Sequence, residues 1–189
     1  MSHVKGLVLL SRFEYLDFKQ GTGELKKLLK KTSTDEANFV RQPVDGANLY
    51  PEEILVRVDE ALLADHFDNK LDEFIILGQW NARNNLAKYF GLYMDEGGPK
   101  AFLDQFARLR DSLIGSGKMT IAESSNDKLL VIIEYEQPVP KSVCLSEQGF
   151  MSEGLVLCGA KNLKIKELVS AGDGKSNQTK LEVTFSLND

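Results

Sequence analysis

The last third of the chain constrains the fold more than any other segment. Residues 142–160 have the spacing of an amphipathic helix, whereas residues 163–169 and 181–187 alternate between apolar and polar side chains. A polar turn through Gly172, Asp173 and Gly174 separates the two alternating runs. Alternation with a period of two is typical of strands that bury one face of a sheet. This segment therefore predicts a helix followed by a β-hairpin.

A second hairpin is predicted immediately before that helix. Residues 119–122 and 129–135 are the two strand-like runs, a polar turn at 124–127 joins them, and Pro138 and Pro140 end the hairpin. Two antiparallel hairpins can form one sheet, and the helix between them can cross over that sheet. The C-terminal part is therefore predicted to be a four-stranded antiparallel sheet with one crossing helix.

The N-terminal part is predicted to be helical. Apolar residues recur there at spacings of three and four, and Tyr50-Pro51-Glu52-Glu53 is a strong helix start. The fold class is thus α+β, an N-terminal helical half followed by hairpin–helix–hairpin. We expect one domain over residues 1–189, with a helical part at 1–115 and a sheet-and-helix part at 116–189. The predicted helices are 4–19, 24–31, 51–66, 71–93 and 100–114, with a short extended piece at 38–40.

Composition narrows the class of protein. With 42% hydrophobic and 27% charged residues in 189, the chain has an ordinary globular composition and needs no disulfide or metal to support a core. The net charge of −5 argues against nucleic-acid binding, and residues 26–31, the dense basic run, are best explained as a solvated helix face. No apolar run approaches the ~20 residues of a membrane span. A cytoplasmic location is therefore expected.

The chain offers few groups for catalysis or metal binding. His3 is terminal, and His66 is best explained as a helix C-cap that uses the helix dipole. Cys144 and Cys158 fit no zinc spacing, and on one helix they would lie about 21 Å apart, too far for a disulfide. We predict no catalytic and no metal residues. The alternative is an enzyme with Cys144 as a nucleophile at its helix N-terminus.

Three sequence segments resemble a known family. They are residues 5–8 (Lys-Gly-Leu-Val), 77–81 (Leu-Gly-Gln-Trp-Asn) and 148–155 (Gln-Gly-Phe-Met-Ser-Glu-Gly-Leu). With the order of elements, they resemble the haem nitric oxide/oxygen-binding (H-NOX) family over nearly the whole chain. The late helix is also similar to 4-vinyl-reductase (V4R) domains, to transport-particle subunits of the Golgi tethering complex and to uncharacterised myxobacterial-type proteins of similar length. The resemblance implies the same fold.

The chain departs from the family at the residues that hold the cofactor. The resemblance implies a histidine on the helix after the Gly-Pro break, but Arg110 lies near that position and this helix has no histidine. The family's Tyr-x-Ser-x-Arg motif binds the haem propionates, and here residues 135–139 (Tyr-Glu-Gln-Pro-Val) keep only Tyr135. V4R domains often carry metal-binding cysteines in the last hairpin, where residues 168–187 have none. We therefore expect no cofactor.

Two functions follow from a sensor-type fold without haem. The first is a non-enzymatic sensor or binding module of a bacterial signalling system that holds a small apolar molecule or a lipid. The alternative is a protein–protein interaction scaffold with a filled core, which binds a signalling partner or forms a homodimer. A haem-based gas sensor with unusual ligation is the second alternative. Trp80 is explained either as a pocket wall or by helix packing, and the candidate apolar pocket is Phe74, Trp80, Phe106, Leu109, Phe150 and Met151.

Overall fold

The computed structural model describes residues 3–34, 38–90, 98–115, 117–125 and 127–187. They form two compact units. The helical unit comprises residues 1–73 and 112–115, and the sheet unit comprises residues 74–111 and 116–189. The helices predicted at 71–93 and 100–114 thus group mainly with the sheet. The expectation of a single domain over the whole chain stays a prediction.

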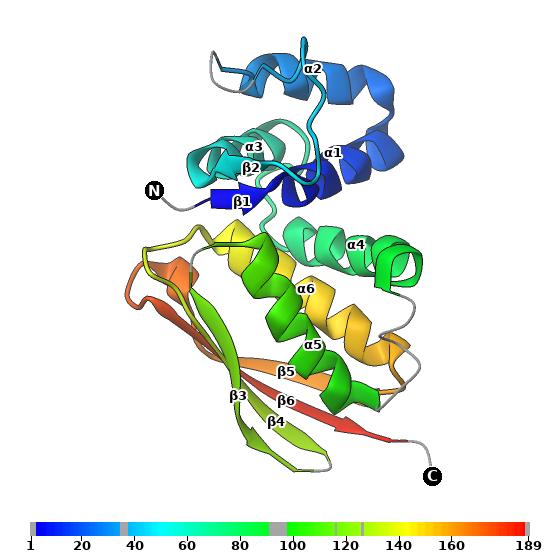
Figure 1. Cartoon of the computed structure of the whole chain (residues 1–189), viewed down its shortest axis with the longest axis vertical. Helices are drawn as coiled ribbons and strands as arrows, with labels where there is room; N and C mark the ends of the chain where they lie inside the picture. Colours follow the sequence, from blue (N-terminus) through cyan, green and yellow to red (C-terminus); the bar gives the residue numbers. More distant parts are fainter. Residues whose placement is uncertain (1–2, 35–37, 91–97, 116, 126, 188–189) are drawn as a thin grey trace. The chain divides into compact units, whose positions relative to one another are not determined.

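Three helices and a two-stranded sheet build the helical unit (Figure 1). Val4, predicted to be helical, instead lies in a strand, where it pairs with Tyr50 and bridges to Ile114. These backbone partners satisfy the polar groups of a segment whose Val4 side chain is fully buried. The elements are β1 (His3–Lys5), α1 (Gly6–Gln20), α2 (Thr22–Thr32), β2 (Leu49–Pro51) and α3 (Glu52–Asp65).

The extended piece predicted at residues 38–40 is wrong. Residues 39–40 form a turn, which Asn38 closes by accepting hydrogen bonds from the backbone N–H groups of Arg41 and Gln42. The turn places Phe39 edge-on against Phe13, with 5.5 Å between the ring centroids. An asparagine that bonds to the following backbone competes with strand pairing, which explains the difference.

The predicted antiparallel sheet is confirmed in the sheet unit. Its strand order is β3-β4-β6-β5, and each neighbouring pair is antiparallel. A helix lies between the two hairpins, as predicted, and it connects central strand β4 to edge strand β5. A short 3₁₀ turn, η2 (Ala171–Asp173), lies at the last hairpin. The strands are β3 (Lys118–Ser124), β4 (Lys128–Glu134), β5 (Lys161–Val169) and β6 (Gln178–Ser186), and the crossing helix is α6 (Lys141–Leu157).

Two further helices complete the sheet unit, α4 (Glu73–Phe90) and α5 (Gly98–Leu113). The end of the helix predicted at 71–93 lies outside the described residues. One face of the sheet packs against α5 and α6 (Figure 1), and the alternating residues of β4 and β6 form that buried face. The inward-facing residues are Leu129, Val131 and Ile133 of β4 and Leu181, Val183 and Phe185 of β6.

Helices α4 and α6 cross in backbone contact because a glycine lies on each side of the crossing. A Cβ atom added at Gly78 would overlap the carbonyl oxygen of Ser146, and one added at Gly149 would overlap that of Ile75. These glycines belong to residues 77–81 and 148–155, which carry the sequence resemblance. The two segments therefore encode one close helix packing.

Replacing either glycine should destabilise the protein strongly. We expect Gly78→Ala and Gly149→Ala each to cost about 1–3 kcal/mol or more, because the helices must move apart. Gly23→Ala is the matched control, since it lies in α2 with open space around it and should be neutral or stabilising by about 0.5–1 kcal/mol. Urea unfolding of the three variants measures the difference. Equal stability of all three would contradict the close crossing.

Candidate functional site

A buried carboxylate, Glu147, accepts hydrogen bonds from two residues on different elements of the sheet unit. Arg110 Nε donates to Glu147 Oε1 at 2.9 Å, and the Tyr135 hydroxyl donates to Glu147 Oε2 at 2.6 Å. Arg110 is 2% exposed, Tyr135 is 4% exposed and Glu147 is 6% exposed. The Arg110 guanidinium also lies 5.1 Å from the centroid of the Tyr135 ring, a cation–π contact. We call these three residues the buried polar cluster.

The cluster connects three segments of the chain. Arg110 lies in the last turn of α5, Tyr135 follows β4 directly, and Glu147 is in the second turn of α6. A charge taken out of water at such a place is tolerated only when it is paired and hydrogen-bonded. Asp111, partly exposed, lies 3.4 Å from the guanidinium and adds to the pairing. The cluster is therefore held together by compensation of charge.

The protonation states in the cluster are fixed by burial and by Glu147. Burial alone would lower the pKa of Arg110, but the charges of Glu147 and Asp111 and the hydrogen bond to Glu147 outweigh it, so the pKa is raised. Burial, and then the negative charge of Glu147, hold the pKa of Tyr135 well above its usual value. Arg110 thus stays a cation and Tyr135 a neutral donor at physiological pH. Neither is poised for proton transfer.

Cys144 is buried beside this cluster and does not have the properties of a nucleophile. Its sulfur lies 3.8 Å from the Tyr135 hydroxyl and 3.7 Å from the Thr179 hydroxyl. Burial, and then Glu147, raise the pKa of the Cys144 thiol. A reactive thiol needs a lowered pKa, so the raised pKa counts against the alternative in which Cys144 is a nucleophile. Both thiols are free, as predicted, and Cys158 caps α6, which ends at Leu157.

The structure brings two members of the candidate apolar pocket into direct contact. The rings of Phe106 and Phe150 stack, with 5.2 Å between centroids and 19° between planes. Phe102, which sequence reasoning missed, extends the stack with its centroid 5.9 Å from that of Phe106. Phe74 and Met151 are buried, whereas Trp80, Leu109 and Phe150 are partly buried. That these residues surround a ligand stays a prediction.

The histidines have structural positions in the helical unit. His66 is the C-cap residue of α3, as predicted, and its Nδ1 lies 2.8 Å from the side-chain oxygen of Gln20. His3 is exposed in β1. Within the ranges that the structure describes, no three His, Cys, Asp or Glu residues gather into a metal-binding group. No helix there has the length and apolarity of a membrane span.

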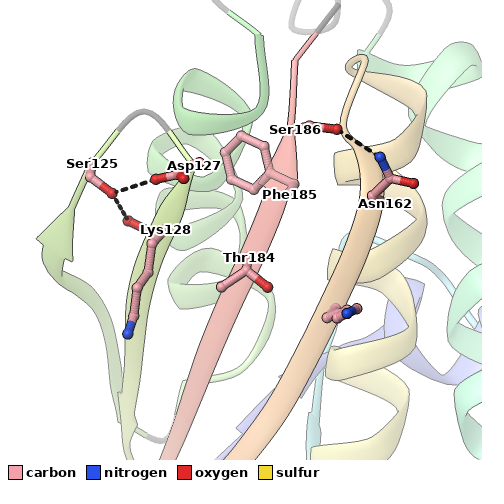
Figure 2. A pocket seen from close by; sticks show the side chains of 8 residues that line it. Ser125, Asp127, Lys128, Asn162, Thr184, Phe185 and Ser186 are labelled. Carbon is pink, nitrogen blue, oxygen red and sulfur yellow. Dashed lines mark hydrogen bonds between the residues drawn. The ribbon is translucent and has the colours of Figure 1, made fainter.

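A groove that sequence reasoning missed crosses the ends of β4, β6 and β5 (Figure 2). Its volume is about 380 Å³. Ser125 bonds to Asp127 on one side, and the Asn162 amide donates to the Ser186 hydroxyl on the other at 3.0 Å. Strand pairing alone brings these side chains together, so no sequence motif marks the groove. It is lined by Ser125, Asp127, Lys128, Asn162, Lys164, Thr184, Phe185 and Ser186.

Solved structures with the same arrangement of elements are H-NOX domains. An unliganded Fe(II) H-NOX protein from K. algicida matches with a TM-score of 0.74 and 12% identity, over 97% of each chain. An oxygen-binding H-NOX domain related to soluble guanylate cyclases, in its oxygen complex, matches with a TM-score of 0.73 and 11% identity, over 96% of this chain and 94% of that one.

A third match is an H-NOX protein from S. oneidensis, with a TM-score of 0.73, 13% identity and coverage of 98% and 97%. This chain has the H-NOX fold. The fold that the resemblance implied is therefore confirmed, whereas the likeness to V4R domains stays a prediction. No family model and no curated protein sequence matches the chain. The likeness is thus one of fold, at identities of 11–13%.

The residues at the expected haem contacts do not fit a haem held in the manner of that family. Arg110, which the sequence resemblance places near the family's iron-binding histidine, carries a guanidinium, a cation with no lone pair to give. Tyr135, which the resemblance assigns to the propionate motif, donates its hydroxyl to Glu147. Arg110 and Tyr135 are thus linked through the carboxylate of Glu147.

Breaking the buried polar cluster should be far costlier than breaking a surface ion pair. We expect Glu147→Gln to lower the free energy of unfolding by about 3–5 kcal/mol, because Arg110 is left buried without its counter-charge. The control is Glu24→Gln, whose partner Lys27 is 73% exposed, with an expected loss of at most about 1 kcal/mol. Adding Arg110→Met to Glu147→Gln should restore stability. Equal losses in the two single variants would contradict the arrangement.

The buried thiol should react slowly. In a Cys158→Ser variant, which leaves Cys144 alone, we expect little alkylation by iodoacetamide at neutral pH, because burial raises the thiol pKa. Unfolding in urea should speed the reaction greatly. The measurement is mass spectrometry of the alkylated fraction over time. Rapid labelling of the folded variant would contradict this prediction and support Cys144 as a nucleophile.

Proposed function

We propose that this chain is a haem-free, non-enzymatic binding module of a bacterial signalling system. The observation that carries the proposal is Glu147, whose two oxygens accept hydrogen bonds from Arg110 and Tyr135. These are the positions at which the family resemblance expects an iron ligand and a propionate donor. A buried, charge-compensated cluster there supports a domain that keeps the H-NOX fold and has lost the haem site.

A non-enzymatic role is supported by the state of the titratable groups. Burial and Glu147 keep Tyr135 and the Cys144 thiol protonated, and Arg110 is a fixed cation. A site that performs acid–base or nucleophilic chemistry needs groups that exchange protons near neutral pH. Two free thiols fit a reducing compartment and thus a cytoplasmic location.

The aromatic stack favours binding at the surface over binding inside the sheet unit. Phe102, Phe106 and Phe150 lie ring against ring, and Phe102 packs so closely on α6 that a Cβ atom at Gly154 would overlap its ring. This close packing supports a filled interior rather than an open one at the candidate apolar pocket. This supports the interaction scaffold as the form of the binding module, with a small apolar molecule or lipid as its competitor.

Haem titration and native mass spectrometry test the proposal together. We expect no stoichiometric Soret band when the purified chain is mixed with haemin and then reduced, while a haem-binding H-NOX protein serves as the positive control. The native mass should be that of the chain alone, 21.1 kDa, or of its homodimer. A Soret band at one haem per chain would overturn the haem-free proposal.

The same mass measurement separates the scaffold from the ligand-binding form. An additional mass of a few hundred daltons, removed by organic extraction, would favour a small apolar molecule or a lipid over the packed interior. Phe106→Ala should then weaken its retention. If no additional mass is found, the result supports the interaction scaffold.

A further inference from the structure

The face of the sheet that points away from α5 and α6 is basic, although the chain as a whole is acidic. Strand register aligns Lys128, Thr184 and Lys164 in one row across β4, β6 and β5. The next row holds Leu130, Glu182 and Lys166. Ile132 and Lys180 follow, and then Glu134 and Gln178. Over these rows of β4, β6 and β5, four lysines stand against two glutamates, in a chain with a net charge of −5.

Glu182 lies between Lys128 and Lys166 and offsets only part of this charge. Lys128 forms an ion pair with Glu182, with 2.8 Å between Nζ and Oε2. The pKa of Glu182 is lowered, first by Lys128 and then by the nearby charge of Lys166. Lys164 and Lys166 are exposed on β5. We call the side of the sheet formed by Lys164 and Lys166 the lysine edge.

Strand β5 is also an edge strand. It pairs with β6 on one side, and in the part of the sheet unit that the structure describes no strand pairs with its other side. Edge strands present unpaired backbone N–H and C=O groups, which accept an added strand. At nine residues, β5 is longer than β3 or β4 and offers room for several backbone hydrogen bonds.

The groove of Figure 2 lies at the beginning of β5 and continues the lysine edge. Lys164 supplies a cation to it, Lys128 supplies a second one that is paired with Glu182, and Thr184, Ser186 and Asn162 supply hydroxyl and amide groups. Asp127 is its one carboxylate. The lining is thus suited to acidic or polar side chains from a strand that runs along β5.

Charge decides which occupant fits. A second copy of the chain would bring its own Lys164 and Lys166 against those of the first, and like charges opposite each other destabilise a strand pair. Nucleic acid bound to an open sheet needs aromatic side chains for stacking, and the outward-facing residues of β4, β6 and β5 include none. A strand with acidic residues at alternate positions forms favourable cross-strand pairs with the lysines.

We propose that the lysine edge binds an acidic, extended segment of a partner protein, which adds to β5 as a fifth strand of the sheet. Backbone hydrogen bonds along β5 provide affinity, and pairing with Lys164 and Lys166 provides specificity. The inference rests on the proposed binding role. It does not depend on the absence of haem, so the haem titration and the experiment below can fail separately.

Peptide binding tests the proposal. The probe is a fluorescein-labelled peptide of alternating glutamate and valine, about ten residues long, and binding to the full chain is followed by anisotropy. We expect Lys164→Glu/Lys166→Glu to weaken binding at least about tenfold. Lys26→Glu/Lys30→Glu makes the same charge change on exposed lysines of α2 and should leave binding unchanged. Circular dichroism confirms that both variants are folded.

Modified peptides distinguish strand addition from electrostatic attraction alone. One further peptide is N-methylated at its odd positions and another at its even positions. Both keep the charge of the parent peptide, but each loses the backbone N–H donors on one side of the strand. At least one of them should bind more than about tenfold more weakly than the parent. A glutamine–valine peptide should bind weakly, and salt should weaken the parent peptide.

Four results would overturn the proposal. They are no binding of the acidic peptide at about 1 mM, equal losses in the two lysine variants, unchanged affinity of both N-methylated peptides, and binding of phosphatidylserine vesicles or single-stranded DNA in place of the peptide. The last would assign the lysine edge to a membrane or to nucleic acid.

Discussion

The sheet unit depends on the pairing of the buried Glu147 carboxylate with Arg110 and Tyr135. Because the carboxylate is buried, its charge must be met inside the protein, and Arg110 and Tyr135 meet it from α5 and from the end of β4. One side chain of α6 therefore fixes the positions of a second helix and of the hairpin exit. The aromatic stack of Phe102, Phe106 and Phe150 lies between the same two helices and adds apolar contact to this fixed frame.

The fold is shared with the structural neighbours although little of the sequence is. Gly78 and Gly149 preserve the helix crossing, and the alternating strands preserve the sheet, so the H-NOX architecture is retained at 11–13% identity. A cofactor site needs a few side chains of the right type, and those can change without loss of the packing. Fold and function are therefore separable here, and the function has to be argued from the site.

Sequence periodicity predicted the four-stranded sheet and its crossing helix because a buried face imposes a regular spacing on apolar residues. It missed β1 and β2, since three-residue strands such as His3–Lys5 are too short to show a period. At the predicted extended piece, the backbone and side-chain oxygens of Asn38 accept hydrogen bonds from the next residues and form a turn, which an analysis of hydrophobic spacing does not detect. Glu147 was missed because a single acidic residue in an amphipathic helix is ordinarily solvated.

The sequence by itself determined the α+β class, the strand order along the chain, the unpaired thiols and the absence of a histidine near Arg110. Tertiary structure decided that Arg110 and Tyr135 share one carboxylate, that the rings of Phe102, Phe106 and Phe150 stack on one another, and that lysines align along the free side of β5. The physical reason is distance along the chain. Local spacing governs periodic burial, whereas partners separated by tens of residues meet only when helices and strands pack.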